Sequence, residues 1–182
     1  MAGSLVLLDE FTASNSASVI LGGGSSGSSS YNYAIDSTYN VYMATWVDVV
    51  SANDNVSMYV RITKSGSADT TSNYDLVFKN LRVETSFSNT GNTNESYLNF
   101  GNMGTGTSET QQGTMYLFNF ANASEYSFMT VERTNLMADP NYLYGQMGGA
   151  VHTVASASDG LQFYIASGNI SSGEFKLYGL KK

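Results

Sequence analysis

His152 is the only histidine in the chain, so any imidazole chemistry would depend on it. A Ser-His-Asp triad needs an imidazole between a nucleophilic serine and a carboxylate. The surrounding segment "GGAVHTVASAS" contains no G-x-S-x-G turn of the kind that presents a nucleophilic serine. We therefore expect His152 to lie on a strand surface or at an interface, without a catalytic role.

Carboxylates are the second group that could do chemistry, because a pair of them flanking a glycosidic bond hydrolyses it in most glycosidases. The candidates are Asp9, Glu10, Asp48, Asp54, Glu125, Glu132 and Asp139. All of them are explained as solubilising residues on strand edges and loops. Polysaccharide depolymerases also usually need a much longer, repeat-built β-helix. We expect no enzymatic activity.

Metal and cofactor sites have little support. The segments "SANDNVS" and "MADPNY" gather Asp and Asn oxygens that could bind calcium. Neither has the D-x-D-x-D-G spacing, and Asx turns explain both clusters. The chain has no cysteine, which excludes disulfides and thiolate-bound zinc. We expect neither a metal nor a cofactor.

Tyrosine is the more suggestive residue type, with 13 in the chain. Two segments, "SSYNYAIDSTYNVY" and "PNYLYGQ", place six of them in or near expected loops. Such tyrosines either cover the ends of the fold or contact a protein partner or a sugar ring. The candidate interface or glycan-contact residues are Tyr31, Tyr33, Tyr39, Tyr42, Tyr142 and Tyr144.

The composition narrows the classes of partner. Charged residues make up 13% of the 182 residues, about half the usual share of roughly 25%. The net charge is −7, and the eight Lys and Arg residues form no basic run beyond Lys181-Lys182. Nucleic acid and anionic membranes are therefore not expected partners. There is no signal-peptide pattern and no apolar run of membrane-spanning length. A low-charge surface rich in Gly, Ser, Thr and Asn fits a protein that is covered in a large assembly.

Apolar residues alternate with polar ones over most of the chain, which predicts β-strands. We expect about ten to eleven strands, near residues 5–11, 17–21, 41–50, 56–63, 74–84, 96–100, 113–120, 126–134, 142–154, 160–167 and 173–180. They predict a single all-β domain over residues 1–182, an antiparallel jelly-roll-like β-sandwich. The Gly/Ser-rich segment 22–30 has strand signals on both sides, so we interpret it as a loop and not as a domain boundary.

Two of the turns predict antiparallel hairpins. "ANDN" (52–55) would join the strands near 41–50 and 56–63, and "SGNISSG" would join those near 160–167 and 173–180. In the second turn we expect Gly168 and Asn169 to supply the positive φ angles that a tight turn needs. Gly168 and Gly173 bracket the turn, and Gly179, within the last strand, leaves room for close packing.

The closing segment "FYIASGNISSGEFKLYGLKK" resembles the end of a group of small bacteriophage virion proteins, many from phages of marine bacteria. These proteins end on a strand, an "sGNI.sG" turn and a final "lYG" strand. The segment "IDSTYNVYMATWVDVVSANDNVSMYVRIT" (35–63) is similar to an earlier part of the same group. Together the two segments cover less than a third of the chain. The group includes tail-fibre, receptor-binding, head-fibre and decoration proteins.

The resemblance implies a non-enzymatic β-sandwich component of the virion, assembled in the host cytoplasm. A capsid decoration protein or short tail accessory protein fits a bare single domain better than a fibre, which usually carries a shaft or anchor before its tip. We expect this chain to associate with itself as a homotrimer and to dock on capsid or tail proteins. The alternative is a receptor-binding tip that recognises host surface glycan through the tyrosine-rich loops.

Overall fold

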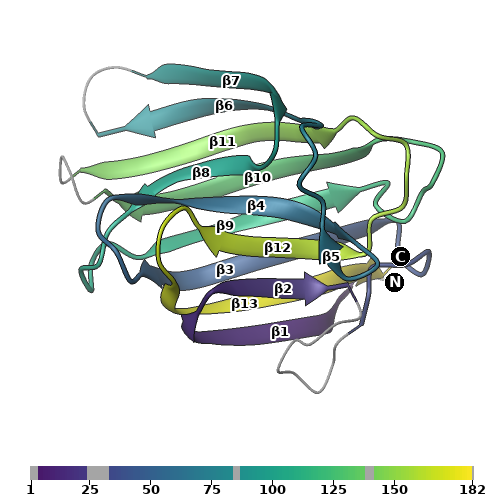
Figure 1. Cartoon of the computed structure of the whole chain (residues 1–182), viewed down its shortest axis with the longest axis horizontal. Coiled ribbons are helices and arrows are strands. Elements are labelled where there is room, and N and C mark those ends of the chain that lie inside the picture. Colours follow the sequence, from purple (N-terminus) through teal and green to yellow (C-terminus); the bar gives the residue numbers. More distant parts are fainter. Residues whose placement is uncertain (1–3, 24–32, 84–86, 138–141, 182) are drawn as a thin grey trace.

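Two antiparallel sheets stacked face to face form the structure (Figure 1). The computed structural model describes residues 4–23, 33–83, 87–137 and 142–181. Within these ranges every regular element is a strand, and the thirteen strands divide into sheets of eight and five. The predicted all-β antiparallel sandwich is confirmed. All eleven predicted strands are present, and β5 and β7 are additional.

The larger sheet has the strand order β1-β13-β3-β9-β10-β11-β6-β7. Its strands are β1 (Ser4–Ser16), β13 (Ile170–Lys181), β3 (Val41–Ser51), β9 (Gln111–Phe118), β10 (Ser127–Leu136), β11 (Leu143–His152), β6 (Tyr74–Arg82) and β7 (Ser88–Glu95). β1 pairs with β13 from Ser4 opposite Lys181 onward, so the two ends of the chain lie side by side (Figure 1).

The smaller sheet lies in front of the larger one in Figure 1. It consists of β2 (Ser18–Gly22), β12 (Gly160–Ile165), β4 (Val56–Lys64), β5 (Ser67–Ala68) and β8 (Leu98–Met103). β12 lies between β2 and β4, while β5 and β8 both pair with β4.

The core between the sheets is centred on Trp46 of β3. Its ring stacks on Phe100 at a centroid distance of 5.4 Å and lies 5.7 Å from Phe163. Phe163 in turn contacts Phe175 at 5.1 Å, so four aromatic rings from both sheets interlock. Trp46 also lies below Gly113, where an added Cβ would come within 2.3 Å of the indole. Burial of such side chains contributes about 1.5–3 kcal/mol each.

Both predicted hairpins are wrong. β3 and β4 belong to different sheets, and so do β12 and β13, so each short turn is an arch that carries the chain across the sandwich. Two hydrogen bonds hold the arches side by side. The Ala52 backbone amide donates to the Asn169 carbonyl at 2.9 Å, and the Asn53 side-chain amide donates to the Ser167 carbonyl at 3.2 Å. Packed sheets are only about 10 Å apart, so a four-residue connection is long enough for either topology.

β3 also departs from the uninterrupted alternation predicted for it. Its register against β9 shifts between Trp46 and Val49, and Asp48 has a φ of 52°. This β-bulge lets Trp46 and Val49, three positions apart, both point into the core.

Candidate functional site

The candidate site is the outer face, which we define as the side of the larger sheet turned away from the smaller one. Along β10, Met129 and Val131 are buried in the core, so Phe128 and the residues in step with it point outward. Seven of the twelve large apolar side chains that are more than a third exposed, among the described residues, lie on this face. They are Val47, Val77, Leu81, Tyr116, Phe128, Leu143 and Met147. Contiguous exposed apolar patches are where interaction sites are commonly found, so we take the outer face as the candidate site.

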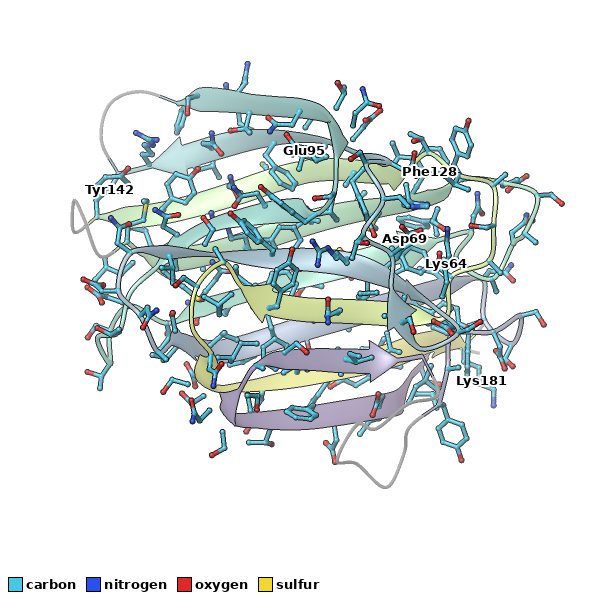
Figure 2. The ribbon with its side chains drawn as sticks, viewed as in Figure 1. Lys64, Asp69, Glu95, Phe128, Tyr142 and Lys181 are labelled. Atoms are coloured by element: carbon cyan, nitrogen blue, oxygen red, sulfur yellow. The ribbon has the colours of Figure 1, made fainter. Side chains whose placement is uncertain are left out.

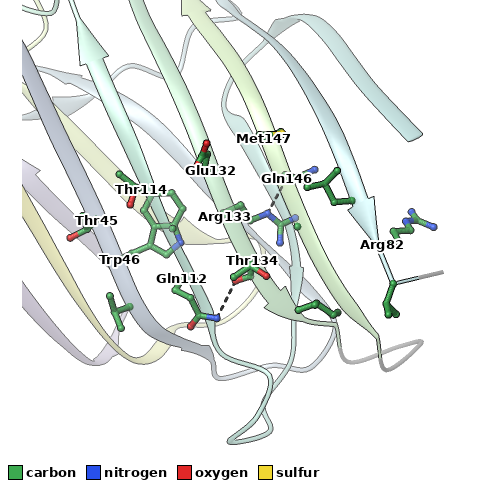
Figure 3. Close-up of a pocket in the computed structure, with 16 residues that line it drawn as sticks. Thr45, Trp46, Arg82, Gln112, Thr114, Glu132, Arg133, Thr134, Gln146 and Met147 are labelled. Carbon is green, nitrogen blue, oxygen red and sulfur yellow. Dashed lines mark hydrogen bonds between the residues drawn. The ribbon is translucent and has the colours of Figure 1, made fainter. Parts of the chain in front are cut away.

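Three adjoining hollows cross the outer face. The largest, of about 810 Å³, extends from β3 to β6 (Figure 3). It shares Thr114, Glu132 and Met147 with a second hollow of about 600 Å³. The second shares Thr130 with a third of about 450 Å³. Together they make one continuous depression across the face.

The depression lies where small outward residues adjoin, with Gly145 and Gly149 of β11 beside Thr134 and Thr130 of β10. We call three outward residues in the middle of β10 the trough: Thr130, Glu132 and Thr134; Phe128 is also outward, nearer the start of the strand. We call three outward residues of β6 the ridge: Val77, Lys79 and Leu81; Asp75 is also outward, nearer the start of the strand. In the register of the sheet, each trough residue lies opposite one residue of β11 and then one residue of the ridge. The three rows are Thr130–Gly149–Val77, Glu132–Met147–Lys79 and Thr134–Gly145–Leu81.

One charge lies in the trough and one on the ridge. Within the described part of the chain, the Glu132 carboxylate has neither a hydrogen bond nor an ion pair. Lys79 is exposed, donates a 3.3 Å hydrogen bond to Asn89, and has its ammonium 5.8 Å from the centre of the Phe87 ring. Both charges are therefore accessible to a partner.

The other predicted carboxylates do not come together. Asp9 is buried and accepts a 2.8 Å hydrogen bond from the Gly22 amide. Asp48, Asp54 and Glu125 are exposed on connections and at the bulge, and Asp139 lies outside the described residues. Of the candidates, Glu132 is the one that lines the depression. Among the described residues there is no group of three His, Asp or Glu side chains that could hold a metal ion.

His152 is buried, so its predicted position on a surface or interface is wrong. Its ring lies edge-on to Tyr74 at 5.0 Å, and its Nε2 lies 3.3 Å from the Asp69 carboxylate. Asp69 also pairs with Lys64 at 2.8 Å. Burial, together with the nearby charge of Lys64, lowers the pKa of His152. Burial alone would raise the pKa of Asp69, but hydrogen bonds from Lys64 and Thr71 hold it well below its usual range.

The predicted tyrosines do not form one site. Tyr142 lies at one end of the sandwich, far from the Lys64–Asp69 pair at the other (Figure 2). Tyr39, just before β3, and Tyr42, at its start, contact each other edge-on at 5.7 Å. Since β3 and β11 begin at opposite ends of the sheet, this pair is remote from Tyr142 and Tyr144.

Most of these tyrosines are also covered. Tyr42, Tyr142 and Tyr144 are at most 8% exposed, so their rings offer little surface for stacking. The Tyr42 hydroxyl donates to the Asp36 carbonyl at 2.6 Å. Tyr33 is 61% exposed, and Tyr31 lies outside the described residues. The interpretation that tyrosines cover the ends of the fold therefore fits Tyr42, Tyr142 and Tyr144.

A buried arginine holds the Tyr144 end in place, and the sequence analysis missed it. Arg133 is 4% exposed, donates to the Gln146 side chain at 2.9 Å and stacks over the Tyr144 ring at 4.7 Å. Gln146 donates onward to Asn80 at 2.8 Å. Burial lowers the pKa of Arg133 to about 9. The sequence did contain a signal for its burial, because the alternation in β10 places Arg133 on the same face as Met129 and Val131.

A second missed cluster lies on the outward side of the smaller sheet. Tyr59 stacks on Tyr97 at 4.0 Å and meets Tyr164 edge-on at 5.5 Å. The Arg61 guanidinium lies 4.6 Å from the centre of the Tyr164 ring. Burial raises the pKa of Tyr164 to about 12, although Arg61 opposes the shift. Alternation in β4 put Tyr59 and Arg61 on one face but did not show which strands flank them.

The predicted turn residues have separate roles. Gly168 has a φ of 88°, whereas Asn169 has no positive φ and instead donates through its side chain to the Asn15 carbonyl at 3.1 Å. Gly173 has a φ of 147°. At Gly179, an added Cβ would come within 2.5 Å of the Tyr39 ring, which is the close packing expected there.

No protein-family model matches the sequence, and no significant match was found among curated proteins or solved structures. In the ranges that the structure describes, no helix is long and apolar enough to cross a membrane.

Proposed function

We propose that the chain is a non-enzymatic structural protein of a bacteriophage virion, a capsid decoration or tail accessory component whose outer face is covered in the assembled state. One observation supports a binding role above all others: seven of the twelve exposed large apolar side chains of the described residues lie on the outer face. Scattered apolar residues are normal on protein surfaces, but a contiguous patch across neighbouring strands is not.

The virion assignment is supported by the resemblance of the closing segment and of residues 35–63 to phage virion proteins. The low content of charged residues adds to it, because a surface with few charges is suited to close packing against other subunits.

Cryo-electron microscopy of the intact virion tests the proposal. We expect density for this fold at repeated positions on the capsid or at the tail, with the outer face turned toward protein. Purified chain should also co-sediment with particles that lack it. Absence from the particle together with failure to co-sediment would contradict the proposal.

Glycan recognition is the second candidate function, and the cluster of Tyr59, Tyr97 and Tyr164 favours it. Aromatic rings next to a hydrogen-bond donor such as Arg61 are suited to stacking on sugars. If the cluster binds host polysaccharide, the double substitution of Tyr59 and Tyr164 by Ala should remove binding on a glycan array. Substituting the isolated exposed Tyr126 by Ala is the matched control.

A further inference from the structure

The outer face has a shape and charge pattern that fits a second copy of itself. We propose that two copies of this chain pair through their outer faces about a twofold axis parallel to β11, with the ridge of each copy seated in the trough of the other. The inference rests on the proposed function in one respect, namely that the outer face is covered, and it names the partner that covers it.

The strand order provides the symmetry. β11 lies between β10 and β6, so a twofold axis along β11 places the ridge of one copy over the trough of the other. Rotation about an axis parallel to the strands keeps each row of the sheet in register with the same row of the partner. Such an isologous contact satisfies both copies at once.

Size complementarity follows from the rows. Leu81 of one copy lies over Thr134 of the other, a large side chain over a small one, whereas Val77 over Thr130 pairs two side chains of nearly equal volume. The hollows beside these threonines, of about 450 Å³ and 810 Å³, provide the space. Gly149 and Gly145 lie between trough and ridge and leave the approach open.

Charge complementarity follows from the same arrangement. The middle row places Lys79 of one copy over Glu132 of the other, and the symmetry forms this ion pair twice. Glu132 has no partner among the described residues of its own copy, and Lys79 has only the long hydrogen bond to Asn89. The chain as a whole carries a net charge of −7, but in the paired middle row the positive charge of Lys79 cancels the negative charge of Glu132.

The strand on the axis also suits this role. Each outward residue of β11 would lie close to its own symmetry copy, where any charge would be repelled. All of these positions are uncharged: Leu143, Gly145, Met147, Gly149 and Val151.

The available area is sufficient for a stable dimer. The overlap covers the five strands β9, β10, β11, β6 and β7, which span about 24 Å across and about 30 Å along the strands. This corresponds to about 700 Å² on each copy, or about 1,400 Å² in total, within the range of specific protein interfaces. Because the axis is parallel to β11, the two copies of this strand run parallel to each other, and the row matching is centred on Met147.

A charge-swap experiment on the full chain tests the pairing. Sedimentation equilibrium should show a dimer for the native sequence. Glu132→Lys and Lys79→Glu should each weaken dimerisation about 100-fold or more, because each places like charges together twice. The double variant should restore the dimer. Lys176→Glu, on the same row but three strands from the trough, is the control and should leave dimerisation unchanged.

A cross-linking measurement covers the case in which a charge variant fails to fold. The chain has no cysteine, so Met147→Cys introduces a single thiol next to the proposed axis. A short bismaleimide should link two copies of this variant, whereas Thr45→Cys, further from the axis on the same face, should stay unlinked.

Three outcomes would overturn the pairing: a native chain that stays monomeric at 100 times the concentration used for the variants, a double variant that folds but stays monomeric, or Thr45→Cys cross-linking as well as Met147→Cys.

A monomer that binds host polysaccharide through Glu132 would assign the face to glycan instead. A chain that is monomeric but present on the particle removes only the pairing. A chain that dimerises but is absent from the particle removes only the proposed function.

Discussion

At the scale of single residues, two neighbouring glycines of β11 have opposite surroundings. A Cβ at Gly148 would lie 2.1 Å from the Val77 carbonyl oxygen, which is backbone and cannot move aside. At Gly149 the nearest atom would be the Met129 carbonyl oxygen at 3.4 Å, an ordinary contact.

We therefore expect Gly148→Ala to lower the free energy of unfolding by about 2–3 kcal/mol. Gly149→Ala should change it by no more than about 1 kcal/mol, since alanine also restricts the unfolded chain. Urea denaturation at low protein concentration measures both. Equal effects would show that the β11–β6 contact is looser than described.

His152 provides a pH dependence at the same scale. Its pKa is lowered in the folded protein, so the unfolded chain binds the proton more readily and stability must fall as the pH falls below about 6.5. Asp69 acts at a different pH, because its lowered pKa contributes stability that is lost only as the pH falls below about 3.8.

Thermal unfolding between pH 7 and pH 5 checks this prediction. The native chain should lose stability over this window, and His152→Gln, which does not titrate, should lose less. A variant with the same slope as the native chain would assign the pH dependence to other groups.

At the scale of elements, alternation located eleven strands but could not assign them to sheets. The pattern in 41–50 and 56–63 reports that each strand has one buried face, and this is equally true of a hairpin and of an arch. The turn "ANDN" fits both, since a few polar residues can either reverse a strand or cross to the other sheet. For the same reason, Thr130, Glu132 and Thr134 could be placed on one face from the sequence, whereas the ridge beside them required the strand order.

β7 was missed because it carries no apolar signal. Its sequence "SNTGNTNE" contributes no buried side chain, and it is held to the sheet edge by β6 alone. The Asn80 side chain donates to Ser88 and Thr90 and helps to fix it there.

We expect backbone amides of β7 to exchange with deuterium well before those of β13, which has a partner strand on each side and buries Phe175 and Leu177. Hydrogen-exchange mass spectrometry of the isolated chain compares the two strands directly. Equal protection of β7 and β13 would contradict the description of β7 as a weakly held edge.

At the scale of the whole molecule, pairing through the outer face links stability to concentration. A dimer that forms only from folded chains raises the unfolding temperature as the protein concentration rises. We expect the Tm of the native chain to increase over a hundredfold concentration range and that of Glu132→Lys to stay constant. A native Tm that does not change would argue against the pairing, and an equal increase in both proteins would argue against the role of Glu132.

The pairing of Ser4 with Lys181 also determines how the molecule responds to mechanical force. Because β1 and β13 are antiparallel and their outer ends meet, tension applied between those ends loads the ladder one hydrogen bond at a time and peels the strands apart. A load applied across the sheet faces is instead shared by many side-chain contacts at once. A protein of this design resists pulling far better when it is held by a face than when it is suspended by its two ends.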